Sequence, residues 1–201
     1  MSIDSAASAT MQSLSLEQAA PLIQSGDIML CSGSALFSTL IKNATNSQWS
    51  HVGLVFRLAE LGQLMVLESV ETIGVRAVPL SSYISNYNGS GKGYDGKILI
   101  ARHQQFKSDY IVALAEKAVS LLGDPYNTDD IIRIAARVGI KGFGFTSGSN
   151  EIQPQREFIC SEYVYTCFKS VGIAIPYDPM GFIAPADIAD CPDVMPITCL
   201  I

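Results

Sequence analysis

The sequence predicts an α+β domain in which a largely antiparallel sheet packs against helices. In the first half of the chain, apolar or alternating runs rich in Val, Ile and Leu are separated by short turns, at residues 51–57, 64–70, 74–78 and 97–102. Strands joined so closely pair as antiparallel neighbours. The second half has the apolar periodicity of helices, and one of those helices begins at a cysteine. These observations together indicate a sheet that precedes the helices covering it.

The elements before this sheet follow from local signals. Ser15 and Gln18 have the spacing of a capping box, which predicts a short helix that Gly26 ends. Residues 27–31, an aspartate followed by four apolar residues, read as a first strand. A second helix is expected after Ser34, where several apolar residues recur on one face.

The second half alternates helices with irregular segments. Residues 108–122 carry one apolar stripe, with a glycine just past its end, and predict a helix. A further helix is expected to start at Asn127 or Thr128. Residues 141–155 are rich in Gly and Ser and read as a long surface loop, whereas the tail at residues 176–201 holds five of the nine prolines. We expect that tail to run over the surface in extended form.

Composition bounds the class of protein. A chain of 201 residues with 48% apolar and 16% charged residues is long enough to bury a sizeable core, and we expect a flexible leader at residues 1–14 and one domain at residues 15–201. A net charge of −6, without a basic run, argues against a nucleic-acid partner. There is no signal-peptide pattern and no apolar run of the ~18 residues that span a membrane. Five irregularly spaced cysteines fit reduced thiols, so a soluble cytoplasmic protein is expected.

The chemistry centres on the cysteine that opens a predicted helix. Cys160 begins an apolar stripe at helical spacing, and Gly172 supplies the stop. A helix N-terminus offers unpaired N–H groups and the positive end of the helix dipole, which favour a thiolate. His51, one of two histidines in the chain, opens the predicted strand at residues 51–57 and is the candidate base. The apolar stripe comprises Cys160, Val164, Cys167, Phe168 and Val171.

A base of this kind needs a third group that orients its ring. Glu68 is the best candidate, because it lies in the strand that could form a hairpin with the His51 strand. If the hairpin turns near Gly62, His51 lies beyond the direct partner of Glu68, so contact requires a bulge or a longer loop. Alternatively, Glu68 pairs with Arg76 or Arg102 across the sheet.

The histidines and the other cysteines also have purely structural interpretations. Without a partner, His51 would be a strand-end histidine of the core, and the cysteines other than Cys160 read as small buried hydrophobes. His103 follows a strand into a polar loop and is expected to be solvated. The chain has no CxxC pair, so no metal site is predicted, and the glycines at residues 139–148 lack the Walker order of a phosphate loop.

Two segments carry a resemblance to a known family. They are Ser50-His51-Val52-Gly53-Leu54-Val55 and Ile159-Cys160-Ser161-Glu162-Tyr163-Val164, with Gly26-Asp27-Ile28 before them and Leu122-Gly123-Asp124-Pro125-Tyr126 between. Together they resemble the permuted NlpC/P60 group of the papain-like superfamily, in its YaeF/YiiX-like branch. In ordinary NlpC/P60 enzymes the cysteine precedes the histidine, whereas here the order is reversed. The similarity spans roughly residues 26–187.

The resemblance implies a circularly permuted papain-like fold with the nucleophile at a helix N-terminus. It implies Cys160 as nucleophile, His51 as base and Glu68 as the third residue, with Tyr126 and Ser161 at the oxyanion or substrate. The implied activity is that of a cysteine hydrolase, an amidase or peptidase, that cleaves an amide or related acyl bond without a metal or organic cofactor. The implied partner is a small-molecule, lipid or peptide-like acyl substrate.

Two alternatives stay open at this point. Related enzymes transfer the acyl group to an alcohol or an amine, so a lipid or amino-acyl acyltransferase of the same fold is possible. A non-catalytic ligand-binding module that kept the cleft is the other. Reactivity of Cys160 would distinguish an enzyme from a binding module.

Overall fold

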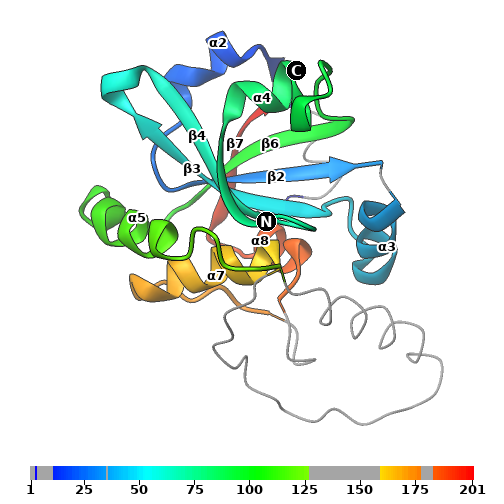
Figure 1. Cartoon of the computed structure of the whole chain (residues 1–201). Helices are drawn as coiled ribbons and strands as arrows, with labels where there is room; N and C mark the ends of the chain where they lie inside the picture. The colour runs from blue at the N-terminus through cyan, green and yellow to red at the C-terminus, as the bar shows by residue number, and fades with distance from the viewer. Residues whose placement is uncertain (1–2, 4–10, 35, 127–158, 178–182) are drawn as a thin grey trace, which may run out of the picture.

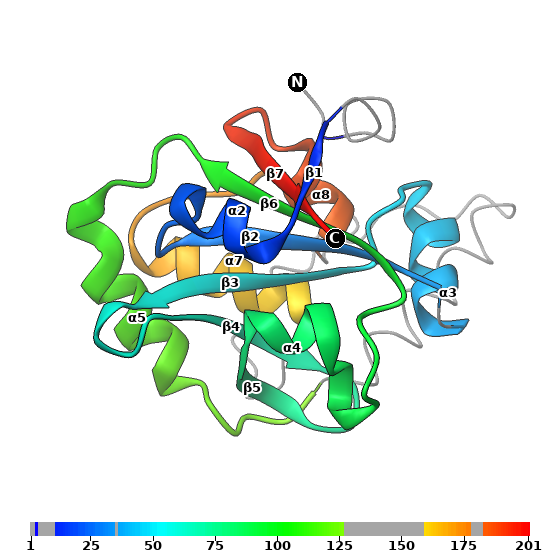
Figure 2. The same ribbon diagram turned by 90° about the horizontal axis from the view of Figure 1, so that it is seen from above.

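A mixed sheet of seven strands forms the centre of the fold, in the order β1-β7-β6-β2-β3-β4-β5 (Figure 2). The computed structural model describes residue 3 and residues 11–34, 36–126, 159–177 and 183–201. Neighbouring strands are antiparallel except β1 and β7, which are parallel. The strands are β1 (Ser13–Leu14), β2 (Asp27–Gly33), β3 (His51–Leu58), β4 (Gln63–Val70), β5 (Gly74–Pro79), β6 (Gly96–His103) and β7 (Val194–Leu200).

Helices cover both faces of the sheet (Figure 1). On one face lie α5 (Ile111–Ser120), α7 (Cys160–Ser170) and α8 (Pro185–Asp190). On the other lie α2 (Leu16–Ala19) and α4 (Leu80–Ser85), while α3 (Leu36–Thr45) stands beyond the end of β2. Short 3-10 turns complete the described helices: η1 (Ala20–Leu22), η2 (Ala59–Leu61), η3 (Tyr87–Gly89) and η4 (Ser108–Tyr110).

The alternation of side chains along each strand divides the core into two layers. Leu54 of β3 belongs to the layer that contains Val164 and Phe168 of α7. Its neighbour Val55 belongs to the opposite layer, with Tyr83 of α4. The face that a strand residue occupies therefore decides whether it meets α7 or α4.

The structure confirms the predicted sheet and most of the predicted helices. The four predicted runs form β3, β4, β5 and β6 almost residue for residue, and the first strand forms β2. Ser15 and Gln18 make the expected capping box at α2, with Gln18 N–H donating to Ser15 Oγ at 3.3 Å. The two apolar stripes form α5 and α7, and each helix is followed by the predicted glycine, Gly123 after α5 and Gly172 after α7.

The φ angles of these two helix stops are +87° at Gly123 and +79° at Gly172. Both lie in the left-handed region that glycine adopts without strain, so each glycine ends its helix as the sequence predicts.

The C-terminal tail differs from its prediction. Residues 176–201 include α8 and β7, and β7 lies inside the sheet between β1 and β6 instead of running over the surface. Pro196 stands opposite Ala101 at a register shift between β6 and β7. A proline has no N–H to donate, and a bulge is one of the few places where a sheet accepts it. His103 is also buried, at 1% exposure, and is not solvated as expected.

Part of the predicted leader is ordered into the domain. Ser13 and Leu14 form β1, and Ile3 is buried, with its carbonyl accepting a hydrogen bond from Trp49 Nε1 at 2.7 Å. The division into a leader at residues 1–14 and a domain at residues 15–201 otherwise stays a prediction. The helix expected at residue 127 or 128 and the loop at residues 141–155 fall outside the described residues. Within the described ranges, no helix is long and apolar enough to cross a membrane.

Candidate active site

The candidate site lies at the end of the sheet where β3 begins. His51 is the first residue of β3 and pairs with Cys31 near the end of β2. α7 packs against β3 and β4 and begins at Cys160. The sheet and the helix therefore bring their reactive residues to the same end of the domain.

The first turn of α7 is fixed on both sides of Cys160. The N–H of Ile159 donates to the Glu162 carboxylate at 3.3 Å, and the Tyr163 hydroxyl donates to the Ala118 carbonyl of α5 at 3.1 Å. The first backbone N–H groups of a helix have no acceptor within the helix, so they are available to an anion placed there. Cys160 itself is 2% exposed.

His51 links Cys160 to Glu68. Its Nε2 lies 2.5 Å from Oε2 of Glu68, and its ring is close enough to Cys160 for the two side chains to interact electrostatically. Because the carboxylate binds Nε2, Nδ1 is the ring nitrogen left for a second partner. Burial disfavours the imidazolium, but the charges and hydrogen bonds of Cys160 and Glu68 outweigh it and raise the pKa of His51 to about 10. The arrangement therefore favours a protonated His51 beside the sulfur.

The contact between His51 and Glu68 crosses the ladder diagonally. Leu54 pairs with Leu67, so the ladder continued by one residue sets Gly53, not His51, opposite Glu68. A Cβ at Gly53 would lie 3.3 Å from the Glu68 Cβ and 3.0 Å from Val66. Without that Cβ, the carboxylate can lean across to the imidazole, within the reach of diagonal neighbours. No bulge or longer hairpin loop is required, contrary to the expectation from the sequence.

Glu68 has two further partners. Its Oε1 accepts from Arg76 Nε at 3.0 Å, and its Oε2 accepts from the Tyr83 hydroxyl of α4. The carboxylate is fully buried, which by itself raises its pKa, but the His51, Tyr83 and Arg76 interactions together lower the pKa below its usual value. Glu68 thus contacts His51 and Arg76 at once, so the two readings of the sequence are compatible.

The other arginine considered for Glu68 has a different partner. Arg102 binds Asp27, with Nε 2.6 Å from Oδ1 and Nη2 2.9 Å from Oδ2. The alternative pairing of Glu68 with Arg102 is therefore wrong.

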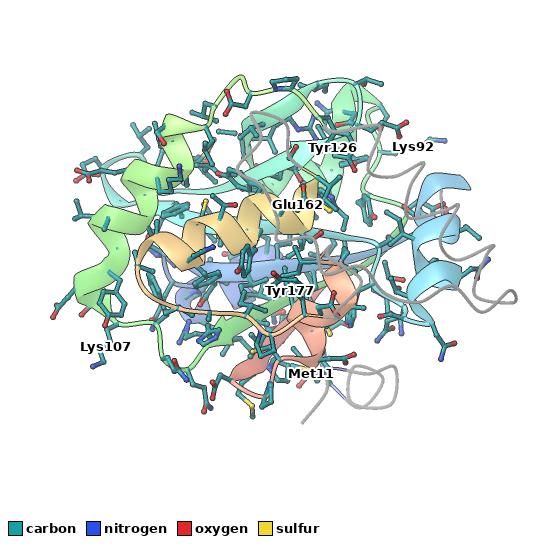
Figure 3. The ribbon with its side chains drawn as sticks, turned by 90° about the horizontal axis from the view of Figure 1, so that it is seen from below. Met11, Lys92, Lys107, Tyr126, Glu162 and Tyr177 are labelled. Carbon is teal, nitrogen blue, oxygen red and sulfur yellow. The ribbon has the colours of Figure 1, made fainter. Side chains whose placement is uncertain are left out.

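Tyr126 lies near the start of α7, where Figure 3 shows it close to Glu162. The segment before it is tied to β5, because Val75 N–H donates to the Asp124 carbonyl at 2.8 Å. Burial raises the pKa of the Tyr126 phenol, and the nearby charges of Cys160, Glu71 and Glu162 raise it further. Tyr126 therefore keeps its proton and remains a hydrogen-bond donor close to Cys160.

The Ser161 hydroxyl is engaged elsewhere. Ser161 is fully buried and its Oγ donates to the Ile183 carbonyl at 2.7 Å. This bond fastens α7 to the segment that leads into α8. The side chain holds the helix in place, while the part of Ser161 that faces the helix start is its backbone N–H.

Tyr83 is the site residue that the sequence did not reveal. It belongs to α4, a six-residue helix that was not predicted. Its ring packs against Tyr87 and Tyr94, with centroids at 4.9 and 5.5 Å. This aromatic contact holds the hydroxyl of Tyr83 on the carboxylate. The only available signal was the apolar spacing of Leu80, Tyr83 and Ile84, too short to establish a helix.

Cys31 is the other thiol beside the histidine. Burial raises the pKa of Cys31 well above its usual value, and the charges of Glu68 and Cys160 raise it further. Cys31 therefore keeps its proton. All five cysteines are buried free thiols. Among the described residues, no group of three or more His, Cys, Asp and Glu side chains could hold a metal ion.

Comparison with known proteins identifies a family and a fold that this chain shares. Residues 22–180 match the model of a family described as permuted papain-like amidase enzymes, YaeF/YiiX. A crystal structure described as the metalloprotein YiiX from Escherichia coli O157:H7 superposes with a TM-score of 0.62 and 19% identity, covering 87% of this chain and 96% of that one. That likeness shows a shared fold. No curated protein matches the chain.

Proposed function

Since this chain belongs to the family of permuted papain-like amidases that includes YaeF and YiiX, we propose that it cleaves an amide or related acyl bond with Cys160 as the nucleophile. The observation that carries the proposal is the position of His51, whose Nε2 is hydrogen-bonded to Glu68 and whose pKa is raised by the neighbouring Cys160 as well as by Glu68. A cysteine, a base and a group that orients the base are the parts that thiol hydrolysis requires.

In the first half of the reaction, the Cys160 sulfur attacks the carbonyl carbon of the substrate. A C–S bond forms and the carbonyl electron pair moves to oxygen, where the N–H groups at the start of α7 and the Tyr126 hydroxyl stabilise the negative charge. Collapse of this intermediate breaks the C–N bond. The proton held by His51 goes to the leaving amine, which departs and leaves a thioester on Cys160.

In the second half, water enters in place of the amine. His51, now neutral, takes a proton from the water as its oxygen attacks the thioester carbon. Collapse breaks the C–S bond and releases the carboxylic acid, which restores the sulfur and the protonated imidazole. Throughout both halves, Glu68 holds the imidazole by Nε2, which leaves Nδ1 to carry the proton that is exchanged.

The test is the pH dependence of Cys160 alkylation by iodoacetamide, followed by peptide mass spectrometry, in the wild type and in His51→Ala. The thiolate is the form that reacts. We expect labelling of the wild type to persist well below the free-thiol pKa of ~8.5, and the variant to lose this low-pH labelling. Labelling that rises only near ~8.5 in both proteins would contradict the proposal.

The same site could pass its acyl group to an alcohol or an amine instead of water. An added amine that competes for the acyl group during turnover of an identified substrate would indicate transfer. Release of free acid alone, unaffected by the amine, indicates hydrolysis, which is the expected result.

A further inference from the structure

Both carboxylate oxygens of Glu68 accept hydrogen bonds, and each of the neighbouring groups in the described residues acts as a donor. Oε2 receives His51 Nε2 at 2.5 Å and the Tyr83 hydroxyl. Oε1 receives Arg76, with Nε at 3.0 Å and Nη2 at 2.9 Å. A guanidinium can donate but cannot accept a hydrogen bond, so a proton on Oε1 would face Arg76 without an acceptor. The contact geometry fits the ionised carboxylate.

Arg76 is directly opposite Glu68 in the β4–β5 ladder. Its side chain is 15% exposed and that of Glu68 is 0% exposed, so the pair is largely removed from water. A buried carboxylate without a cation tends to take up a proton, because burial disfavours its charged form. Arg76 supplies that cation to Glu68 from the opposite strand.

Among the residues that the structure describes, the titratable groups besides His51 and Arg76 that interact electrostatically with Glu68 or Cys160 are neutral or negative. Cys31 of β2, Tyr83 of α4 and Tyr87 of η3 have raised pKa values and are neutral near pH 7. Tyr94, before β6, and Tyr126, before α7, are neutral for the same reason. Near Tyr126, the two carboxylates Glu71 and Glu162 add negative charge.

We propose that Arg76 is a positioning residue that keeps Glu68 ionised and thereby keeps His51 protonated beside Cys160. This inference rests on the proposed function, because it assigns a role within the same site. Arg76 does not touch the sulfur. It acts through Glu68, and its removal allows the carboxylate to accept a proton as the pH falls, after which the imidazole loses its charged partner.

The test compares Cys160 labelling by iodoacetamide across pH in the wild type, Arg76→Gln and Arg76→Lys. The quantity of interest is the pH below which labelling falls. An adjacent arginine shifts a carboxylate by roughly 1–3 pH units, so we expect this limit to rise by about one unit or more in Arg76→Gln. Labelling at about pH 5 would then fall roughly tenfold. Arg76→Lys keeps the charge and should restore most of the wild-type profile.

Arg102→Gln is the matched control. Arg102 forms an equivalent ion pair in the same sheet, with the buried Asp27, but does not contact Glu68. We expect its labelling limit to stay at the wild-type pH, even if its thermal stability falls as in Arg76→Gln. A shift of equal size in both variants would assign the effect to general destabilisation and would overturn the proposal.

Tyr83→Phe provides a second, milder variant. It removes one donor from Oε2 and leaves both charges in place, so a smaller shift in the same direction is expected. An unshifted limit in folded Arg76→Gln, or in Tyr83→Phe if Arg76→Gln does not fold, would overturn the role of this network. Failure of the proposed function is distinguishable, because then the wild type itself labels as an ordinary thiol that is indifferent to His51.

Discussion

Replacement of Glu68 by glutamine tests how strongly the carboxylate stabilises the charged imidazole. Glutamine keeps the size of the side chain but offers one carbonyl oxygen in place of two carboxylate oxygens. In the wild type, Oε2 lies 2.5 Å from His51 Nε2 and Oε1 faces Arg76. Whichever way the amide is turned, its NH₂ group meets a donor, either the guanidinium or the imidazolium.

The magnitude follows from the loss of a charge-assisted hydrogen bond, which contributes about 1.5–3 kcal/mol. Since one pKa unit corresponds to about 1.4 kcal/mol, the pKa of His51 should fall by roughly 1–2 units in Glu68→Gln. The pKa of His51 should remain above the ordinary histidine value, because Cys160 also contributes to the raised wild-type value of about 10.

Nitrogen-detected NMR of the imidazoles measures this directly, because the chain contains two histidines. Burial lowers the pKa of His103, so its titration is separated from that of His51. His103 contacts Cys191 and not Glu68, and it serves as an internal control that should not move. A His51 signal that titrates as an ordinary histidine in the wild type, or that Glu68→Gln leaves unchanged, would refute this reasoning.

Three further outcomes are expected. The pKa of His51 is raised from 6.5 to about 10, so its contribution to stability is complete below about pH 6.5 and is lost as the pH rises through about 10. Denaturant unfolding should show the advantage of the wild type over His51→Gln shrinking by more than about 1 kcal/mol across that interval; a constant difference would count against it. Ser161→Ala loses the bond to Ile183 and should lower the free energy of unfolding by about 1–2 kcal/mol without changing the pH profile of labelling, and a changed profile would place the hydroxyl in the site. Gly53→Ala puts a Cβ 3.3 Å from that of Glu68, so it should cost about 1–3 kcal/mol and lower the pKa of His51 in the NMR titration, whereas an unaltered titration would show that the contact tolerates the methyl group.

Local sequence patterns located most of the sheet and the helix that carries Cys160. The apolar runs specify β3 and β4, whose side chains enter both layers of the core, and the stripe from Cys160 to Phe168 matches one buried face of α7. The same patterns failed where a long-range partner decides the structure. The prolines of residues 176–201 predict a tail that runs over the surface, yet β7 lies inside the sheet and accommodates Pro196 at a register shift against β6.

The site shows the same division. The sequence singled out Cys160, His51 and Glu68, and the structure brings these three together. The sequence did not show how His51 reaches Glu68, because the missing side chain at Gly53 matters only once β3 and β4 are in register. Tyr83 was missed because its role depends on a short helix that gains its position from packing on the sheet.

In the proposed site, Cys160 is a thiolate and His51 is an imidazolium, so the proton lies on the histidine. Ultraviolet difference absorption between the wild type and Cys160→Ser measures thiolate without a substrate or a labelling reagent. At about pH 6, well below the free-thiol value of ~8.5, we expect one thiolate's absorption in the difference and its loss when His51→Ala is the parent protein. No thiolate signal in the wild type at that pH would contradict the ion pair and, with it, the assignment of Cys160 as the nucleophile.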